Sequence, residues 1–305
     1  MRVAFLYEHP TWSAELLSRM SERRIDVTSI DIGNPEHHHR LADHFDLWVN
    51  RINIMPSTGR SATLAAGARH LLLSLDVRGE RVFNGLSAHL IGGSKLAQSE
   101  LFARLDLHTP ASVGVYDPSD VGPAVARMGF PVLVKPNLGG SGSGIVRYDD
   151  EAQVRAAFAA GAIDFGSDGT GVVQQVITSE DGFVHRLEIL AGKLQYATRQ
   201  AIQDGVYNYC AADGCAVPQT DSETTSHPIE IVEPDPEVVS EVMAIVAEAG
   251  ADVAGVEYLV DAENRRRCFY DFNPYSNLIA GQNDRLGFDP IDRFIDEVVA
   301  AATHP

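Results

Sequence analysis

The chain of 305 residues is 45% hydrophobic and 22% charged, which is enough apolar material for roughly two domains with buried cores. Its formal net charge of -18 argues against a nucleic-acid partner, because a phosphate backbone is bound by clustered Lys and Arg side chains. Three cysteines do not make a disulfide framework, and no apolar stretch reaches the roughly 20 residues of a membrane span. We therefore expect a cytoplasmic protein with no membrane partner.

The first part of the chain alternates strand-like and helix-like segments, which is typical of a parallel α/β sheet. Its first helix carries Leu16, Leu17 and Met20 on one face. In chain order the pattern predicts strands at 3–7, 25–32, 45–49 and 81–83, and helices at 11–23 and 61–75. The adjacent residues 37–39 are all histidines; they do not face one point, so we interpret them as a solvated loop rather than a metal site.

Two further units of mixed α and β structure follow. The middle unit has predicted helices at 94–105, 121–128 and 151–159 and predicted strands at 131–135 and 145–148. The last unit opens with residues 172–177, has predicted strands at 187–190, 193–197, 255–260 and 267–272 and a predicted helix at 236–249, and ends with the segment 289–302. Together the three units predict an α/β fold with α+β parts.

A glycine-rich loop follows a strand and a lysine. The strand at 131–135 ends at Lys135, and the loop reads Gly-Gly-Ser-Gly-Ser-Gly at 139–144. Glycine lets consecutive backbone N–H groups approach an anion, so the lysine and the loop predict a phosphate site; a flexible surface turn is the alternative. The order of the parts excludes a Walker A loop, in which the lysine ends the loop, and a protein kinase, in which the glycine loop precedes the lysine.

Two strand-like segments late in the chain each carry an acid within an apolar run. Glu257 lies in the first, and Asp271 lies in the second, which closes on Asn273-Pro274. Asp271 and Asn273 are two residues apart, so their side chains point to one face of a strand. Two carboxylates and an amide oxygen suit Mg²⁺, with Mn²⁺ as the other candidate metal. The alternative is that both acids lie on a solvated sheet face.

The order of these parts resembles that of ATP-grasp ligases, most closely those of the RimK and glutathione-synthetase kind. The resemblance extends along most of the chain: to Asn50-Arg51 after the third strand, Asn84-Gly85 and Ser94-Lys95 around the first ATP lysine, the adenine hinge at 172–177, and Arg199 with Asn208. The sequence departs from the family where Glu257 and Asp271 exchange the usual Asp and Glu, and where Gln175 replaces an acid. Residues 275–277 replace a Pro-Gly pattern, which argues against the glutamate-adding activity of RimK itself.

The resemblance implies a fold in three parts. These are a Rossmann-like pre-ATP-grasp domain at 1–87, a central subdomain with the glycine loop at 88–173, and a C-terminal subdomain with the metal site at 174–305. The two subdomains would clasp ATP between them, and pairing of two copies through the first unit would make a homodimer.

The resemblance also implies an ATP-dependent carboxylate–amine ligase that uses Mg²⁺. A substrate carboxylate attacks the γ-phosphate to give an acyl phosphate and ADP, and an amine then displaces phosphate to form an amide. Small amino-acid-like molecules are the expected acid and amine. The alternatives are a ligase that modifies a peptide or carrier protein, a phosphotransferase that stops after the first step, and a non-catalytic ATP-binding regulatory protein.

The resemblance assigns roles to four groups of residues. The expected ATP ligands are Lys95, Lys135, Gly140, Ser141, Gly142, Ser143, Gly144, Gln174, Gln175, Val176, Ile177 and Asp181; the catalytic residues are Arg199, Asn208 and Arg186; the metal ligands are Glu257, Asp271 and Asn273; and the substrate residues are Arg51, Arg60, Tyr275, Ser276 and Asn277. For Lys95, Arg186 and Arg199 the alternative is an ordinary surface cation.

Overall fold

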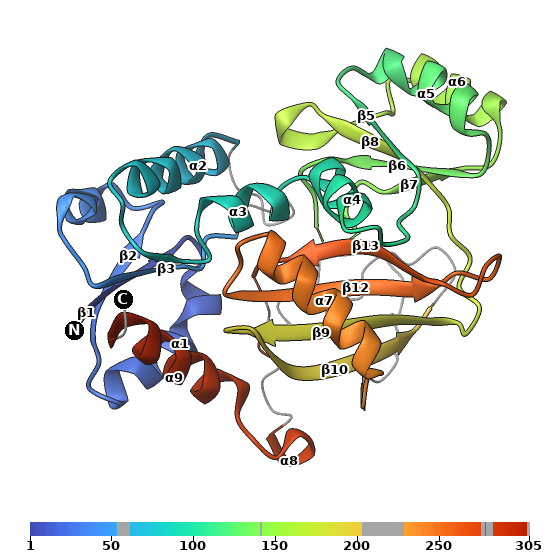
Figure 1. The fold of residues 1–305 in the computed structure, drawn as a ribbon. Helices are drawn as coiled ribbons and strands as arrows, with labels where there is room; N and C mark the ends of the chain where they lie inside the picture. The colour runs from blue at the N-terminus through green and yellow to red at the C-terminus, as the bar shows by residue number, and fades with distance from the viewer. Residues whose placement is uncertain (54–61, 141, 203–228, 276–277, 279–282, 304–305) are drawn as a thin grey trace.

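The computed structural model describes residues 1–53, 62–140, 142–202, 229–275, 278 and 283–303. Residues with predicted roles that lie outside these ranges are Arg60, Ser141, Asn208, Ser276 and Asn277. The described part of the chain forms three sheets, each covered by helices (Figure 1). None of the described helices is long and apolar enough to cross a membrane.

The first sheet is parallel and has the strand order β2-β1-β3-β4. Both of its faces are covered, as a parallel sheet requires, and the central strand is buried at five of its six positions. Its strands are β1 (Arg2–Tyr7), β2 (Asp26–Asp31), β3 (Leu47–Asn50) and β4 (Val82–Phe83), and its helices are α1 (Pro10–Glu22), η1 (Pro35–Ala42) and α2 (Ala62–Val77).

The last helix of the described chain returns to this first sheet. The helix α9 (Pro290–Thr303) buries Phe294, Ile295 and Val298 in the same core as β1, β3 and α1. The ring of Phe294 meets that of Phe83 edge-on, with the ring centroids 5.6 Å apart. The α1–α9 pair covers one face of the sheet and α2 covers the other (Figure 1). The first core is therefore completed by residues that lie more than 200 positions after its strands in the sequence.

The central unit is a small antiparallel sheet of order β5-β8-β6-β7, with two helices on one face. Its edge strand β5 was not among the predicted strands, because Ser-Val-Gly-Val is a short segment with a glycine inside. The unit consists of β5 (Ser112–Val115), η3 (Pro118–Asp120), α5 (Val121–Met128), β6 (Val132–Pro136), β7 (Val146–Tyr148), α6 (Glu151–Ala159), η4 (Gly166–Asp168) and β8 (Gly171–Gln175).

The third sheet has five antiparallel strands in the order β11-β10-β9-β12-β13. One face is apolar and packs on α7 and α4, and the other face carries polar and charged side chains. The elements are β9 (Phe183–Leu190), β10 (Lys193–Ala201), β11 (Glu230–Val232), β12 (Val253–Val260) and β13 (Arg267–Asn273), with α3 (Leu86–Gly92), α4 (Lys95–Arg104), α7 (Pro236–Glu248) and α8 (Asn283–Leu286).

Contacts between elements cross the predicted boundaries at 87/88 and 173/174. The helices α3 and α4, assigned by sequence to residues 88–173, contact β13 of the third sheet. The strand β8 lies between β5 and β6, whereas the predicted boundary at 173/174 divides it. The predicted subdomain at 174–305 includes α9, which packs on the first sheet. The three boundaries remain a prediction.

Candidate active site

Lys95 opens helix α4 and points at the third sheet. Ser94 caps the helix by accepting a hydrogen bond from the Ala97 N–H at 3.2 Å, and the Asn137 carbonyl accepts one from the Lys95 N–H at 3.1 Å. The amine Nζ contacts Asp271 Oδ1 and donates to Gln98 Oε1 at 3.3 Å. Burial lowers the pKa of Lys95 to about 8, with Glu257 opposing that shift. The helix start therefore delivers a cation to the acidic strands.

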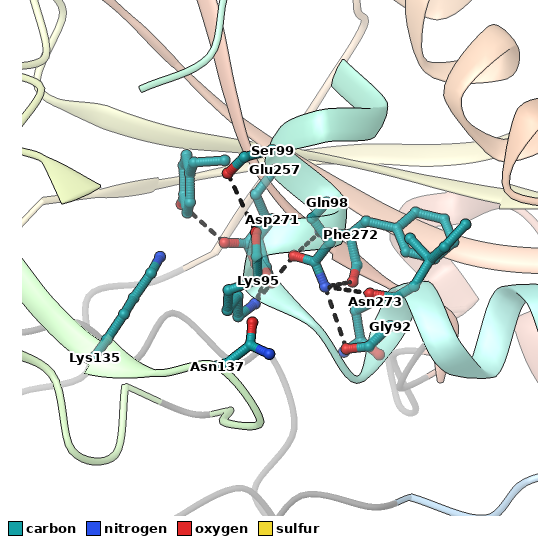
Figure 2. A network of polar contacts seen from close by, with 12 residues as sticks. Gly92, Lys95, Gln98, Ser99, Lys135, Asn137, Glu257, Asp271, Phe272 and Asn273 are labelled. Carbon is teal, nitrogen blue, oxygen red and sulfur yellow. Dashed lines mark hydrogen bonds and ion pairs between the residues drawn. The ribbon is translucent and has the colours of Figure 1, made fainter. Parts of the chain in front are cut away.

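Lys135 comes from the central unit and is 6% exposed. Its Nζ donates to Gln174 Oε1 at 2.8 Å, and Gln174 Nε2 in turn donates to Ser112 Oγ at 2.9 Å. Leu133 pairs with Gln174, so Lys135 and Gln174 lie on the same face of β6 and β8. Burial first, and then the nearby Lys95 charge, lower the pKa of Lys135 to about 7, with the Glu257 carboxylate opposing that shift. In Figure 2 both lysines extend toward the strands of Glu257 and Asp271.

Lysine is rare in this chain, which makes its placement informative. The sequence has 21 arginines and only three lysines. Two of these, Lys95 and Lys135, are buried together at this site, and Lys193 is on the surface beside Glu297. A buried lysine is uncommon, because desolvation disfavours the charged amine; here Lys95 contacts the Asp271 carboxylate, whereas Lys135 donates to the neutral Gln174 amide. The scarcity of lysine elsewhere is a sequence signal for a site that needs compact cations.

The acids predicted as metal ligands lie side by side on the third sheet. Glu257 pairs with Asp271, and Gly255 pairs with Asn273, so the three side chains share one sheet face. Glu257 accepts hydrogen bonds at both oxygens: Arg186 Nη1 donates to Oε1 at 2.8 Å, and Tyr270 OH donates to Oε2 at 2.8 Å. The register therefore places the three predicted metal ligands on one face of the third sheet, and their binding of a metal stays a prediction.

These residues fit a metal that also takes phosphate oxygens. Within the described ranges, no cluster of three or more His, Cys, Asp and Glu side chains could hold a metal ion by itself. Two carboxylates and one amide oxygen are too few to surround Mg²⁺, but they suit an ion that keeps water and phosphate oxygens as its other ligands. The donor set therefore matches a shared metal–phosphate site rather than a closed cage.

Arg186 links the acids of β9 and β12. Its Nε donates to Glu188 Oε1 at 2.7 Å, and its Nη1 donates to Glu257. Burial opposes the charge, but the carboxylates of Glu188 and Glu257 raise the pKa of Arg186 above its ordinary value. The guanidinium lies over Gly255, where an added Cβ would be 2.0 Å from Nη2. Glycine at this position is needed for close approach, which the sequence pattern did not reveal.

The described part of the glycine loop has glycine at positions that require it. Gly142 and Gly144 have φ values of 69° and 74°, and a Cβ on Gly144 would lie 2.8 Å from Pro136 Cγ. The N–H of Ser143 donates to the Gly140 carbonyl at 3.1 Å. The loop therefore forms a tight turn shortly after Lys135, and its contact with phosphate remains a prediction.

Comparisons with known proteins agree on the architecture. The D-alanine–D-alanine ligase of Kocuria rhizophila is 27% identical over 224 residues, which are 69% of this chain and 53% of that protein. The D-alanine–D-alanine ligase of Cupriavidus pinatubonensis is 35% identical over 75 residues, which are 25% of this chain and 23% of that protein. The chain thus spans about half or less of the length of these curated relatives. No family model matches the chain.

Solved structures align over nearly the whole chain. The D-alanine–D-alanine ligase of Bacillus anthracis complexed with ATP has a TM-score of 0.69 at 15% identity, covering 99% of this chain and 97% of that chain. The ATP-grasp ligase PsnB complexed with a minimal precursor has a TM-score of 0.66 at 16% identity, covering 98% and 99%. A RimK domain ATP-grasp protein of Sphaerobacter thermophilus has a TM-score of 0.64 at 15% identity, covering 98% and 100%.

The chain has the ATP-grasp fold. The predicted α/β class with α+β parts is therefore confirmed. A further PsnB structure, with a TM-score of 0.62 at 16% identity and 99% coverage of both chains, contains Mg and ADP. At this identity the structural likeness establishes the fold, and the ligands belong to those proteins.

The structure separates Arg199 from the charged face of the ATP-grasp site. Thr198 pairs with Arg186, whereas Arg199 pairs with His185, so Arg199 points to the opposite side of the third sheet. Its Nε donates to Glu230 Oε2 at 2.7 Å, and its guanidinium lies 4.4 Å from the centre of the Phe183 ring. The catalytic role of Arg199 stays a prediction that this placement does not favour, and Arg186 occupies the site face instead.

The predicted adenine hinge is only partly free to bind a nucleotide. Gln174 is buried and engaged by Lys135, while Gln175 is exposed and half-buried Val176 and Ile177 follow the end of β8. Asp181, the predicted ribose partner, is held in its own turn. It accepts hydrogen bonds from the Phe183 N–H at 3.1 Å and from Ser179 Oγ at 2.9 Å, and it pairs with His185. Ribose binding by Asp181 remains a prediction.

The substrate residues that the structure describes are Arg51 and Tyr275. Tyr275 is 6% exposed, and its hydroxyl contacts His89 Nδ1, so it lies inside the protein rather than on an open surface. Burial lowers the pKa of Arg51, while the carboxylates of Glu8 and Glu188 raise it. Arg51 is therefore already flanked by acids, which makes it less suited to bind a substrate carboxylate than its position in the sequence indicated.

Asn84, which sequence reasoning named only as part of a segment, joins the first sheet to the site strands. Its Nδ2 donates to the Val253 carbonyl at 2.8 Å and contacts the Pro274 carbonyl, and its Oδ1 accepts from the N–H groups of Asp252 and Val253. Its φ is 59°, a conformation that asparagine tolerates better than most residues. An asparagine immediately before a glycine is the local signal for such a backbone.

Proposed function

We propose that this protein is an ATP-dependent carboxylate–amine ligase that works through an acyl phosphate and releases ADP and phosphate. One observation carries the proposal. Two of the three lysines of an acidic chain, Lys95 and Lys135, come from different parts of the fold and are buried beside the Glu257–Asp271 pair. Cations next to carboxylates that suit a metal form a phosphate site in chemical terms.

The two lysines would neutralise the phosphates so that a carboxylate anion can approach the γ-phosphorus. Glu257, Asp271 and Asn273 would hold Mg²⁺, which when bound supplies further charge neutralisation at the phosphate oxygens. Lys95 contacts Asp271 in the ligand-free protein, so nucleotide binding would exchange this ion pair for contacts to phosphate. The glycine loop would cover the phosphates and exclude water, which would otherwise hydrolyse the acyl phosphate.

Arg186 is the candidate to stabilise the charge that develops during acyl transfer. It is fixed by Glu188 and Glu257, and its Nη2 is buried without a hydrogen-bond partner among the described residues. A positioned guanidinium with a spare donor can bind an oxyanion without reorganising first. The prediction from sequence preferred Arg199 for this role and gave Arg186 less support, whereas the sheet register favours Arg186.

We propose small amino-acid-like molecules as the acid and the amine. The sequence likeness to D-alanine–D-alanine ligases, which are named for joining two such molecules, supports this choice. A peptide is the second candidate, because PsnB, an ATP-grasp ligase solved with a precursor, shares the fold over 98% of this chain.

The test is nucleotide analysis after incubation with Mg²⁺, ATP and pools of amino acids and small carboxylic acids. We expect ADP and phosphate to appear only with particular pools, and dividing an active pool names the substrates. The variant D271N should abolish this release, whereas K193M, which changes the surface lysine, should not. AMP and pyrophosphate would show adenylation and overturn the proposal. ATP binding without turnover in any pool, including short peptides, would instead indicate a regulatory protein.

A further inference from the structure

The strand β13 contains one extra residue opposite the site. Glu257 pairs with Asp271, but the next residue of β12, Tyr258, pairs with Phe269, so Tyr270 is the extra residue of β13 between these two paired positions. Such a β-bulge breaks the alternation of side chains and re-aims the extra residue. Here it brings Tyr270 to the face that carries Glu257 and Asp271, although strict alternation from Asp271 would direct it to the other face.

The bulge places the tyrosine hydroxyl on a predicted metal ligand. Tyr270 OH donates to Glu257 Oε2 at 2.8 Å, while Arg186 Nη1 donates to Glu257 Oε1 at 2.8 Å. Glu257 is 8% exposed, so both contacts are largely protected from water. The carboxylate is therefore held from both ends, by a cation on one oxygen and by a neutral donor on the other.

We propose that Tyr270 is a positioning residue that orients Glu257 for the metal of the ATP complex. The inference rests on the proposed function, because it takes Glu257 as a metal ligand. A ligating carboxylate is commonly oriented by hydrogen bonds from outside the coordination sphere, and loss of such a partner costs about 10–100-fold in metal affinity. A neutral phenol suits this task, since it fixes Oε2 without neutralising the charge that attracts the cation.

Without the hydroxyl, Glu257 has a competing partner. The Glu257 charge already acts on Lys95 and on Lys135. A carboxylate released at Oε2 can turn toward these amines and away from the metal position. The hydroxyl thus keeps an acid available to the metal in a site where two buried lysines attract it.

The experiment compares wild type with Y270F by measuring the Kd of ATP over a series of Mg²⁺ concentrations and in EDTA. We expect the Mg²⁺ concentration that gives half-maximal binding to rise about tenfold or more in Y270F. The Kd in EDTA and the melting temperature of the free protein should stay close to wild type. Y116F is the matched control, because Tyr116 is 69% exposed on the central unit.

Each outcome decides between the two proposals. A Mg²⁺ midpoint in Y270F within twofold of wild type overturns the role of Tyr270 and leaves the ligase proposal standing. If Mg²⁺ strengthens ATP binding and the midpoint shifts in Y270F, but wild type turns over no substrate pool, the role of Tyr270 stands and the ligase proposal is rejected. Equal wild-type binding with and without Mg²⁺, or no ATP binding at all, rejects the metal role of Glu257 and with it that of Tyr270.

Discussion

The third sheet and the central unit supply charged groups to one site under different electrostatic conditions. On the third sheet, Arg186 is bound by Glu188 and Glu257, and Glu257 also accepts from Tyr270. In the central unit, Lys135 donates to the neutral amide of Gln174, and burial lowers its pKa to about 7. One region has its charges compensated before any ligand arrives, and the other holds a cation whose main counter-charge must come from a ligand.

This difference assigns separate tasks to the two regions. A compensated network of buried ion pairs is rigid, because moving one member exposes another as an uncompensated charge. A buried lysine that has no carboxylate partner is stabilised most when an anion binds, because the anion favours the protonated, charged amine. We therefore expect the third sheet to determine geometry and Lys135 to respond to the nucleotide. Four changes test this division, in order of decreasing effect.

The largest effect is expected from G255A, which disturbs the buried ion pairs of Arg186 with Glu188 and Glu257. The new Cβ would lie 2.0 Å from Arg186 Nη2, so the guanidinium must shift from the position in which it pairs with Glu188 and Glu257. Breaking a buried pair costs about 3–5 kcal/mol, and partial relaxation should leave a loss of at least about 2 kcal/mol in the free energy of unfolding. Urea denaturation measures this loss. G122A is the control, because Gly122 lies in α5 with no heavy atom within 4 Å, and it should stabilise slightly.

The second effect is loss of ATP affinity in K135M. Removing the amine deletes a charged contact to phosphate, and we expect the Kd of ATP measured with Mg²⁺ to rise about 10–100-fold. The rise in melting temperature caused by ATP should shrink accordingly. K193M is the control, because it makes the same substitution at an exposed lysine, and it should bind ATP like wild type. Equal losses in both variants would show that overall charge matters rather than the buried site.

The third effect is a pH dependence of ATP binding. The pKa of Lys135 is about 7 in the free protein, so the amine is mostly neutral at pH 8.5. Bound phosphate raises that pKa, so binding takes up a proton and affinity falls as pH rises. We expect about a tenfold weaker Kd at pH 8.5 than at pH 7, and proton uptake in calorimetry with two buffers of different ionisation enthalpy. Proton release, or an unchanged slope in K135M, would contradict the assignment.

The smallest effect is expected from R199Q. Arg199 points away from the charged face and pairs with Glu230, so the Kd of ATP should change less than twofold. Turnover, once substrates are known, should also be retained. A large loss of turnover with unchanged ATP binding would restore the catalytic role that the family resemblance gave to Arg199, and it would remove the distinction between the two sheet faces.

Sequence patterns located most of the strands and most of the helices because their signals are local. The apolar run of β1 and the capped start of α4 could be recognised from neighbouring residues alone. The fold class and the resemblance to ATP-grasp ligases followed from the order of Lys135, the glycine loop and the final acids. Local patterns failed for α9, whose core partners lie near the start of the chain, because no local signal identifies a distant partner.

The face of a strand was harder to predict than its existence. Arg199 was placed beyond a strand expected at 193–197, but β10 extends to Ala201 and contains a shift of register between Leu194 and Tyr196. Tyr270 was overlooked because the bulge depends on pairing with β12. Glu188 was overlooked because its importance comes from Arg186 and Gly255 on two strands. In each case the orientation or role of the side chain depends on a contact between strands, and the periodicity of a single strand cannot predict such a contact.

The return of α9 to the first sheet has a consequence for the order in which the protein folds on the ribosome. The β1–β3 face that Phe294, Ile295 and Val298 cover is synthesised early, and these three side chains emerge more than 200 residues later. At a synthesis rate of about 5–20 residues per second, that apolar face stays uncovered by α9 for about ten seconds or more. The central unit, whose strands lie within residues 112–175, closes its own core much sooner. Nascent chains should therefore depend on holding chaperones mainly through the first sheet.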